Sequence, residues 1–362
     1  MLIKNISALL GPELNFTQST NIQIQKNIFK RIQSNIKPSG KEETIDCEGL
    51  LLIPGFINAH THIADSIGKD VTLNSSVDKR IHPVFGAKSK ILKNTSHENL
   101  ANFMKNTCHS MIQKGITTFV DFREGGTDGV LLLKKVLSDV PIRSIILGRI
   151  EFYNDTAEIR KNLPFPKEKI AELTTLLQKS DGIGISGANE NSTSVLNHYS
   201  KTTKLRVIHS SETKQSVSKS KKITGKSETI RSLFLKPHFL IHMTHASKGD
   251  LFATAKKTRG IVICPRANAS LAEGIPDIEL MQKAGCTLAL GTDNVMINSP
   301  DMFREMDFLW KVTMGLHKKR ISPKEILKMA TVNGGKILKK NIGVIGTGKI
   351  ADCIFLDKHA LD

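Results

Sequence analysis

The sequence predicts an α/β protein with a main part the size of a (β/α)8 barrel and a small sheet shared by both ends of the chain. From residue 51 on, short apolar runs alternate with helical patterns, which is typical of a parallel sheet covered by helices. Eight such runs within roughly 250 residues match a (β/α)8 barrel in size. Glycine-rich turns flank strand-like runs at both ends of the chain, so we expect these ends to share a sheet. A doubly wound open sheet is the alternative, because periodicity does not exclude it.

Length and composition indicate a globular protein. The 362 residues are enough to bury a sizeable core, and 39% of them are apolar while 24% are charged. No apolar run reaches the length of a membrane span, and the N-terminal MLIKNISALLG lacks the long apolar stretch of a signal peptide. The five cysteines are scattered without C-x-x-C spacing, as in reduced cytoplasmic proteins. We therefore expect a cytoplasmic location.

The formal net charge of +18 is large. Such a charge suits an anionic partner: nucleic acid, a phosphorylated metabolite or an acidic membrane. However, lysines are spread along the whole chain, few aromatic residues lie among them, and no nucleic-acid-binding motif is present. We therefore expect neither a nucleic-acid nor a membrane partner. An anionic small-molecule substrate and a homo-oligomer stay open.

The strands are predicted from short apolar runs bounded by turn residues. In the first 50 residues, strand-like runs cover Met1–Leu10 and Asn21–Gln25. The eight predicted barrel strands are Leu51–Ile57, Ile116–Phe122, Ile142–Gly148, Gly182–Ser186, Leu205–His209, Phe239–His242, Gly260–Cys264 and Thr287–Gly291. A last strand covers Cys353–Leu356, after a glycine-rich turn.

Helical patterns lie between several of these strands. They cover His97–Lys114, Gly129–Ser138, Lys167–Lys179, Ser227–Phe234, Lys248–Thr258 and Asp277–Ala284. Two more follow the last barrel strand, Met302–His317 and Ser322–Thr331, the second with Ser322 as N-cap and Pro323 at its first position. The expected domains are 1–50 and 342–362, which together form the small sheet, and 51–341, which forms the barrel.

Polar residues follow nearly every predicted barrel strand, where the active site of a (β/α)8 barrel lies. In strand order they are His60 and His62; Asp121, Arg123 and Glu124; Arg149; Asn189, Glu190 and Asn191; His209 and Glu212; His242 and His245; Arg266 and Asn268; Asp293 and Asn294. Any one histidine alone is more often a polar residue with satisfied hydrogen bonds than a ligand. Four of the 12 histidines, His60, His62, His209 and His242, fall at one end of the barrel, and this joint placement favours a metal site.

Several motifs together resemble the amidohydrolase superfamily. They are PGFINAHTH, HSSE, LIHMTH, CPRAN, ALGTDN followed by SP, and the ending IGTGKIADCIFLD. The chain is most similar to the branch of cytosine, guanine and adenosylhomocysteine deaminases, often described as chlorohydrolases. This resemblance implies a distorted (β/α)8 barrel with a small β-sandwich built from both termini. The chain stops soon after Leu356, where such proteins usually continue, so we expect a trimmed sandwich or a truncated sequence.

The resemblance also implies roles for single residues. It implies four metal ligands, which are His60, His62, His209 and Asp293. It implies that Glu212 is the proton shuttle and that His242 contacts the substrate or the attacking water, with His245 as a competing candidate. Relatives with two metals use a carboxylated lysine after the fourth strand. That strand has no lysine here, and Glu190 is a poor substitute, so one divalent metal is expected: zinc, with iron as the alternative.

These residues suit hydrolytic deamination, which needs hydroxide at neutral pH. A bound divalent metal lowers the pKa of water to about 7. Asp293 can accept a proton from that water, and Glu212 can protonate a ring nitrogen and then the leaving amine. The expected function is therefore metal-dependent deamination of a purine, pyrimidine, pterin or triazine-like ring. The alternatives are hydrolysis of a cyclic amide or a C–Cl bond at the same site, or a catalytically silent binding barrel.

Further residues are candidates for contacts with the substrate. They are Arg123, Glu124, Arg149, His245, Arg266 and Asn268. Arg123 and Glu124 can equally pair with each other. Five lysines follow Glu212 within residues 214–226, in a segment expected to be a loop at the active-site mouth. This loop either attracts an anionic group of the substrate or is simply solvated.

Overall fold

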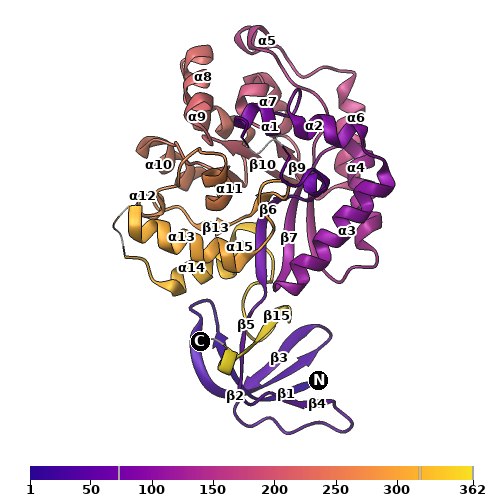
Figure 1. The fold of residues 1–362 in the computed structure, drawn as a ribbon, viewed down its shortest axis with the longest axis vertical. Helices are drawn as coiled ribbons and strands as arrows, with labels where there is room; N and C mark the ends of the chain where they lie inside the picture. Colours follow the sequence, from indigo (N-terminus) through magenta and orange to yellow (C-terminus); the bar gives the residue numbers. More distant parts are fainter. Residues whose placement is uncertain (72–73, 317, 319, 361–362) are drawn as a thin grey trace.

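The computed structural model describes residues 1–71, 74–316, 318 and 320–360, and their strands form two sheets. Figure 1 shows a large α/β body with the small sheet at one end. The strands of the large sheet are β6 (Phe56–His62), β7 (Ile116–Arg123), β8 (Arg143–Gly148), β9 (Gly182–Ile185), β10 (Leu205–Ser210), β11 (Phe239–His242), β12 (Ile261–Ile263), β13 (Leu288–Leu290) and β14 (Asp293–Asn294). They pair in the order β13-β12-β11-β10-β9-β8-β7-β6-β14, and every pair is parallel.

The large sheet closes on itself. Only Gly291 and Thr292 separate β13 from β14, so these are two pieces of one strand, one beside β12 and the other beside β6. Backbone hydrogen bonds bridge the gap, from the Gly291 amide to the Ile263 carbonyl at 3.0 Å and from the Thr292 amide to the His60 carbonyl at 3.1 Å. Register shifts between β6 and β7 distort the ring. The predicted distorted (β/α)8 barrel is therefore confirmed, and the open-sheet alternative is wrong.

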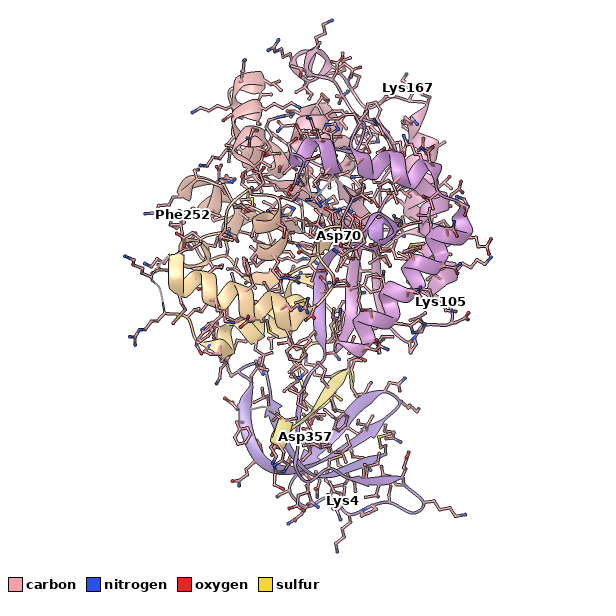
Figure 2. All side chains as sticks on the ribbon, in the orientation of Figure 1. Lys4, Asp70, Lys105, Lys167, Phe252 and Asp357 are labelled. Atoms are coloured by element: carbon pink, nitrogen blue, oxygen red, sulfur yellow. The ribbon has the colours of Figure 1, made fainter. Side chains whose placement is uncertain are left out.

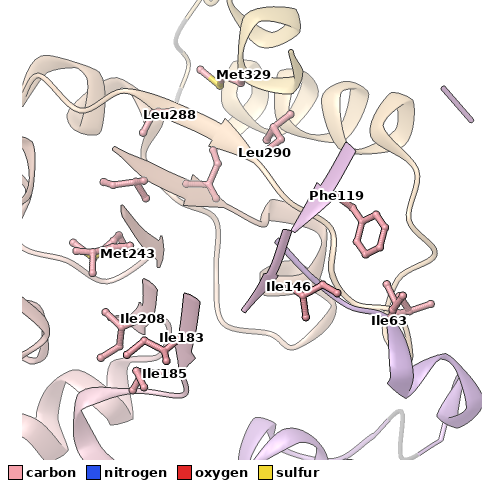
Figure 3. Packing of buried hydrophobic residues seen from close by; sticks show 14 of the residues in the cluster. Ile63, Phe119, Ile146, Ile183, Ile185, Ile208, Met243, Leu288, Leu290 and Met329 are labelled. Carbon is pink, nitrogen blue, oxygen red and sulfur yellow. The ribbon is translucent and has the colours of Figure 1, made fainter. Parts of the chain in front are cut away.

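Alternate residues of the barrel strands face two different apolar layers. In β8, Ile145 and Leu147 belong to the cluster that the strands enclose, whereas Ile146 belongs to the cluster under the helices. Figure 3 shows part of this outer cluster, in which Phe119 of β7 and Leu290 of β13 also take part. Because both faces are buried, the strands contain continuous apolar runs rather than an alternating pattern.

The helices cover the outside of the barrel and its C-terminal rim. They are α1 (Val77–Ile81), α2 (Ala87–Asn94), α3 (His97–Gln113), α4 (Gly126–Leu137), α5 (Thr156–Lys161), α6 (Lys169–Lys179), α7 (Thr193–Tyr199), α8 (Lys214–Thr224), α9 (Glu228–Ser232), α10 (Lys248–Lys257), α11 (Pro265–Ser270), α12 (Ile278–Lys283), α13 (Met302–Leu316), α14 (Pro323–Ala330) and α15 (Val332–Leu338). Each predicted helix has its counterpart; the expected end of the Met302 helix at His317 lies outside the described residues.

One expected loop is a helix. The lysine-rich segment after Glu212 forms α8, which begins at the N-cap Thr213 and ends at Gly225 in the left-handed conformation. The Thr213 side chain accepts a hydrogen bond from the Ser216 amide, and Gly225 has a φ of 72°. The high charge hid this helix, since an exposed helix needs only a narrow apolar face.

The small sheet joins both ends of the chain, as predicted. It comprises β1 (Leu2–Leu10), β2 (Asn15–Gln25), β3 (Ile28–Gln33), β4 (Thr44–Asp46), β5 (Leu50–Pro54) and β15 (Cys353–Asp357). The order is β15-β5-β1-β2-β3, and β4 pairs with β1. In Figure 1, the last strand, β15, lies beside strands from the N-terminal part of the chain.

The predicted first barrel strand, Leu51–Ile57, is wrong because it is two strands in two different sheets. β5 pairs with β1 and β15, and β6 begins only after Gly55. A Cβ atom at Gly55 would lie 2.3 Å from the Thr117 hydroxyl, so glycine lets the chain pass closely from one sheet to the other. Since both strands are largely buried, the apolar run hides the division. The domain bounds at 50 and 341 stay a prediction, and β5 adds Leu50–Pro54 to the small sheet.

Basic side chains are distributed over both parts of the molecule. In Figure 2, Lys4 of the small sheet, Lys105 of α3 and Lys167 before α6 lie far from one another. Among the residues that the structure describes, no helix has the length and apolar character needed to cross a membrane.

Candidate active site

Four side chains that the sequence predicts as metal ligands meet at one end of the barrel. We call His60, His62, His209 and Asp293 the ligand cluster; each offers a ligand atom, and these atoms all lie within 4.8 Å of one another. His60 Nε2 lies 3.1 Å from Asp293 Oδ1 and 3.2 Å from His209 Nε2. His62 Nε2 lies 3.6 Å from the same Asp293 oxygen. His60 and His62 point to one side because they are two apart in β6.

The donor set fits a divalent metal such as zinc. Two ligands of a tetrahedral zinc, each about 2.0–2.1 Å from the metal, lie about 3.4 Å apart, close to the distances in the cluster. His209 Nδ1 donates a hydrogen bond to the Ile185 carbonyl at 2.9 Å, which leaves its Nε2 lone pair facing the cluster. Asp293 Oδ2 is buried and has no hydrogen-bond partner among the described residues. The other oxygen, Oδ1, lies beside His60 and His62, so the carboxylate can offer Oδ1 to a metal while Oδ2 keeps no hydrogen-bond partner among the described residues.

Burial sets the protonation states that a metal requires. It lowers the pKa of His60 and His209, and it lowers the pKa of His62 to about 3, so all three imidazoles are neutral near pH 7. Burial by itself raises the pKa of Asp293, but its interactions with the surrounding histidines, led by the hydrogen bond with His60, outweigh burial, and the net shift is downward. Neutral imidazoles and an ionised carboxylate are the ligand forms that bind divalent metals.

A second group of side chains adjoins the ligand cluster and shares Asp293 with it. We call Glu212, His242 and Asp293 the acid–base group; their ligand atoms also lie within 4.8 Å of one another. His242 Nε2 is 3.6 Å from Glu212 Oε2 and 4.0 Å from Asp293 Oδ2. Burial raises the pKa of Glu212 to about 7. His242 Nδ1 and the side-chain amide of Asn268 are 3.3 Å apart, which orients the imidazole.

The backbone of this site is strained at two of the residues that the sequence predicts to be functional. His242 has a φ of 68° and Asp293 a φ of 61°, in the left-handed region that residues other than glycine rarely adopt. Each such residue costs about 1–3 kcal/mol, and the surrounding fold must supply that energy. Strain of this kind is typical of sites where side-chain direction matters more than stability.

A cavity of about 130 Å³ opens onto both groups. Glu190, Arg149 and Lys88 line it together with His62, His209, Glu212, His242 and Asp293. The Glu190 carboxylate makes no hydrogen bond or ion pair with any residue that the structure describes, and burial raises its pKa to about 7. A second cavity of about 260 Å³ lies next to the first and shares Lys88 and Arg149 with it. Together they offer room for a ring and a substituent.

The remaining predicted contact residues take different positions. Arg149 lines both cavities. Arg123 donates to Glu124 Oε2 at 2.8 Å, so the structural pairing that the sequence left open is present. His245 contacts the Glu273 carbonyl at 2.6 Å, and Arg266 pairs with Glu305 at 3.5 Å; neither lines the cavity at the ligand cluster. Arg266 and His245 are therefore poor candidates for substrate contacts, because other parts of the protein hold their side chains.

Sequence reasoning missed two charged residues beside the cluster. Lys88 of α2 is 6% exposed and lies 2.6 Å from Glu124 Oε1. Asp65, three residues after His62, is 1% exposed and accepts hydrogen bonds from Asn294 Nδ2 at 2.7 Å and the Met296 amide at 3.0 Å. Asp65 could have been suspected from its place after the H-x-H motif, whereas Lys88 carries no local signal.

Comparisons with known proteins show the family of this chain. The model of the amidohydrolase family matches residues 51–362. A putative aminohydrolase of Methanothermobacter thermautotrophicus is 36% identical over 100% of this chain and 92% of its own length. A 5-methylthioadenosine/S-adenosylhomocysteine deaminase of Thermococcus sibiricus is 30% identical over 99% of this chain and 85% of its own length.

A solved structure gives the same fold. Atrazine chlorohydrolase from Arthrobacter aurescens, complexed with zinc, has a TM-score of 0.84 at 16% identity over 100% of this chain and 88% of its own. The resemblance predicted from the motifs is confirmed: this chain belongs to the amidohydrolase family.

Proposed function

We propose that this chain is a hydrolytic deaminase that acts on a C–N bond of a small N-heterocycle with one divalent metal in the ligand cluster. The observation that supports this most is the position of Asp293, which belongs to the ligand cluster and to the acid–base group at once. A metal ligand within 4.8 Å of two further proton-transfer groups, at the wall of a cavity, suits hydrolysis better than metal storage or structural support.

We infer that the metal is zinc, with iron as the alternative. Three imidazoles and one carboxylate form a nitrogen- and oxygen-donor set that leaves a position open for water or substrate. The atrazine chlorohydrolase with the same fold was solved with zinc. When bound, a divalent metal supplies hydroxide near neutral pH, because it lowers the pKa of water to about 7.

The chain's own residues then divide the proton transfers among them. Asp293 Oδ2, which has no hydrogen-bond partner among the described residues, is free to accept a proton from water. Since the pKa of Glu212 is about 7, its carboxyl can protonate a ring nitrogen, then receive the proton that Asp293 took from water, and deliver that proton to the leaving amine. His242, oriented by Asn268, can donate to the oxygen on which negative charge develops.

The substrate is proposed to be a purine, pyrimidine, pterin or triazine-like ring. The Thermococcus relative is named for deamination of 5-methylthioadenosine and S-adenosylhomocysteine, which places adenosine derivatives first among the rings to test. We also propose a cytoplasmic location, in keeping with the scattered cysteines.

The test is a screen for ammonia release by the zinc-loaded protein. The panel contains 5′-methylthioadenosine, S-adenosylhomocysteine, guanine, cytosine and a pterin, with Glu212→Gln as the matched control. Ammonia from at least one ring, lost in the variant, is the expected result. Chloride release from a chlorotriazine, or ring opening of a cyclic amide without ammonia, would replace deamination by one of the alternatives. The fold shared with the atrazine chlorohydrolase makes chloride release the first of these to examine.

A further inference from the structure

Glu124 is fully engaged with protein groups, although it lies beside the cavity. Its Oε1 atom lies 2.8 Å from His62 Nδ1 and 2.6 Å from Lys88 Nζ. Its Oε2 atom accepts a hydrogen bond from Arg123 Nη2 at 2.8 Å. Both oxygens are therefore taken, and neither is free for a substrate. The carboxylate instead contacts the far nitrogen of a residue in the ligand cluster.

Lys88 holds this carboxylate from outside the barrel strands. Its side chain is only 7% exposed, and its Nζ lies between Glu124 Oε1 and Asp65 Oδ2, the latter at 3.5 Å. Asp65, three residues after His62, in turn accepts hydrogen bonds from Asn294 and Met296, which follow Asp293 within three residues. The Lys88 ammonium group thus contacts both the carboxylate that pairs with His62 and the carboxylate that joins the segments of His62 and Asp293.

We infer that Lys88 and Glu124 are positioning residues for the metal site. Glu124 accepts the Nδ1 proton of His62, so Nε2 keeps its lone pair and faces the ligand cluster. The Phe122 carbonyl, 3.2 Å from Nδ1, is a neutral and more distant acceptor for the same proton. Lys88 matters because it is the nearest cation to Oε1, the oxygen that contacts His62, at 2.6 Å against 3.7 Å for Arg149. Arg123 pairs with Oε2, so without Lys88 the one close cation would hold the oxygen that does not contact His62, and the buried carboxylate would turn away from that histidine.

This inference rests on the proposed metal site and assigns to α2 a share in metal affinity, although α2 contributes no ligand. Loss of an outer-sphere partner of a metal-bound histidine typically costs about 10- to 100-fold in metal affinity. We therefore expect that decrease for Lys88→Met and for Glu124→Gln, and an affinity nearer to wild type for Lys88→Arg, which keeps the charge.

The experiment measures zinc affinity by competition with a coloured chelator, independently of turnover. Lys90→Met is the matched control, because Lys90 is exposed on the same helix. The visible spectrum of the cobalt(II)-loaded protein and the melting temperature of the metal-free protein are recorded for each variant. Weaker zinc binding and a shifted cobalt spectrum in Glu124→Gln and Lys88→Met, with the control unchanged, would support the inference.

Three results would overturn it. Wild-type zinc affinity in Glu124→Gln would remove the role of the carboxylate, even if Lys88→Met fails to fold. A lower melting temperature of the metal-free variants with unchanged zinc affinity would make the pair purely structural. A wild-type protein that binds no zinc or cobalt would overturn the proposed function as well, whereas the first two results would leave it standing.

Discussion

The substitution Glu212→Gln separates proton transfer from metal binding. Glutamine has nearly the same shape, and Glu212 is not one of the four ligand-cluster residues, so metal content should stay at that of the wild type. General acid–base catalysis typically contributes about 10²–10⁴-fold, which corresponds to about 2.7–5.5 kcal/mol of transition-state stabilisation. We expect the turnover number to fall by that factor.

Stability should not fall in this variant. Glu212 Oε2 lies 3.6 Å from His242 Nε2, too far for a hydrogen bond, and Oε1 has no partner among the described residues. No folded-state hydrogen bond of the carboxylate is lost, and a neutral glutamine avoids the cost of burying a charge, which raises the pKa of Glu212 to about 7. We therefore expect the unfolding free energy of the variant at pH 7 to be no lower than that of the wild type.

The assay compares ammonia release per bound metal for the two proteins, with metal content from elemental mass spectrometry. Wild-type turnover in Glu212→Gln, at equal metal content, would refute the role of Glu212. Loss of metal together with loss of turnover would show instead that Glu212 is needed to hold the metal.

Three further predictions concern two residues of the metal site region and one buried carboxyl group, Glu305. His60→Ala should bind little or no zinc, because only three ligands remain and the buried cluster loses the imidazole that contacts both Asp293 and His209. Full retention of zinc in elemental analysis would contradict the ligand assignment. Gly291→Ala should weaken zinc binding and lower the melting temperature, since a Cβ atom there would lie 2.7 Å from the Cβ of His60; wild-type values for both would contradict this close packing. Burial raises the pKa of Glu305 to about 8, so the folded state binds its proton more tightly than the unfolded state, and this contribution to stability is lost as the pH rises through about 8. Denaturant unfolding of Glu305→Gln should show a smaller loss of stability between pH 5 and pH 9 than the wild type, and parallel curves would contradict it.

Most of the fold could be predicted because the signals are local. Each barrel strand is buried on both faces, so it reads as a short apolar run, and seven of the eight predicted runs coincide with barrel strands to within a few residues. The remaining predicted run, Leu51–Ile57, covers parts of two strands, and its sequence does not show where the first strand ends and the second begins. Its two halves are largely buried in different sheets. A hydrophobic pattern indicates that residues are buried, but not which sheet or helix covers them.

The site was predictable to the extent that backbone geometry fixes side-chain direction. His60 and His62 share a side because a strand has a period of two residues, and parallel strands bring their carboxyl ends to one rim. The first rule depends only on neighbours in the chain, the second follows from the predicted parallel barrel, and the order of motifs adds His209, Asp293 and the acid–base group.

By itself, therefore, the sequence determined the barrel, the family and the residues that converge at one rim. Only the tertiary structure decided which charged groups serve that site. Lys88 is one of 52 basic residues and has no motif, yet packing of α2 brings its ammonium group to Glu124. Arg266, at the end of a barrel strand, is bound to Glu305 instead. The physical reason is that the partner of a long charged side chain depends on how distant segments pack, and no local pattern in the sequence records that packing.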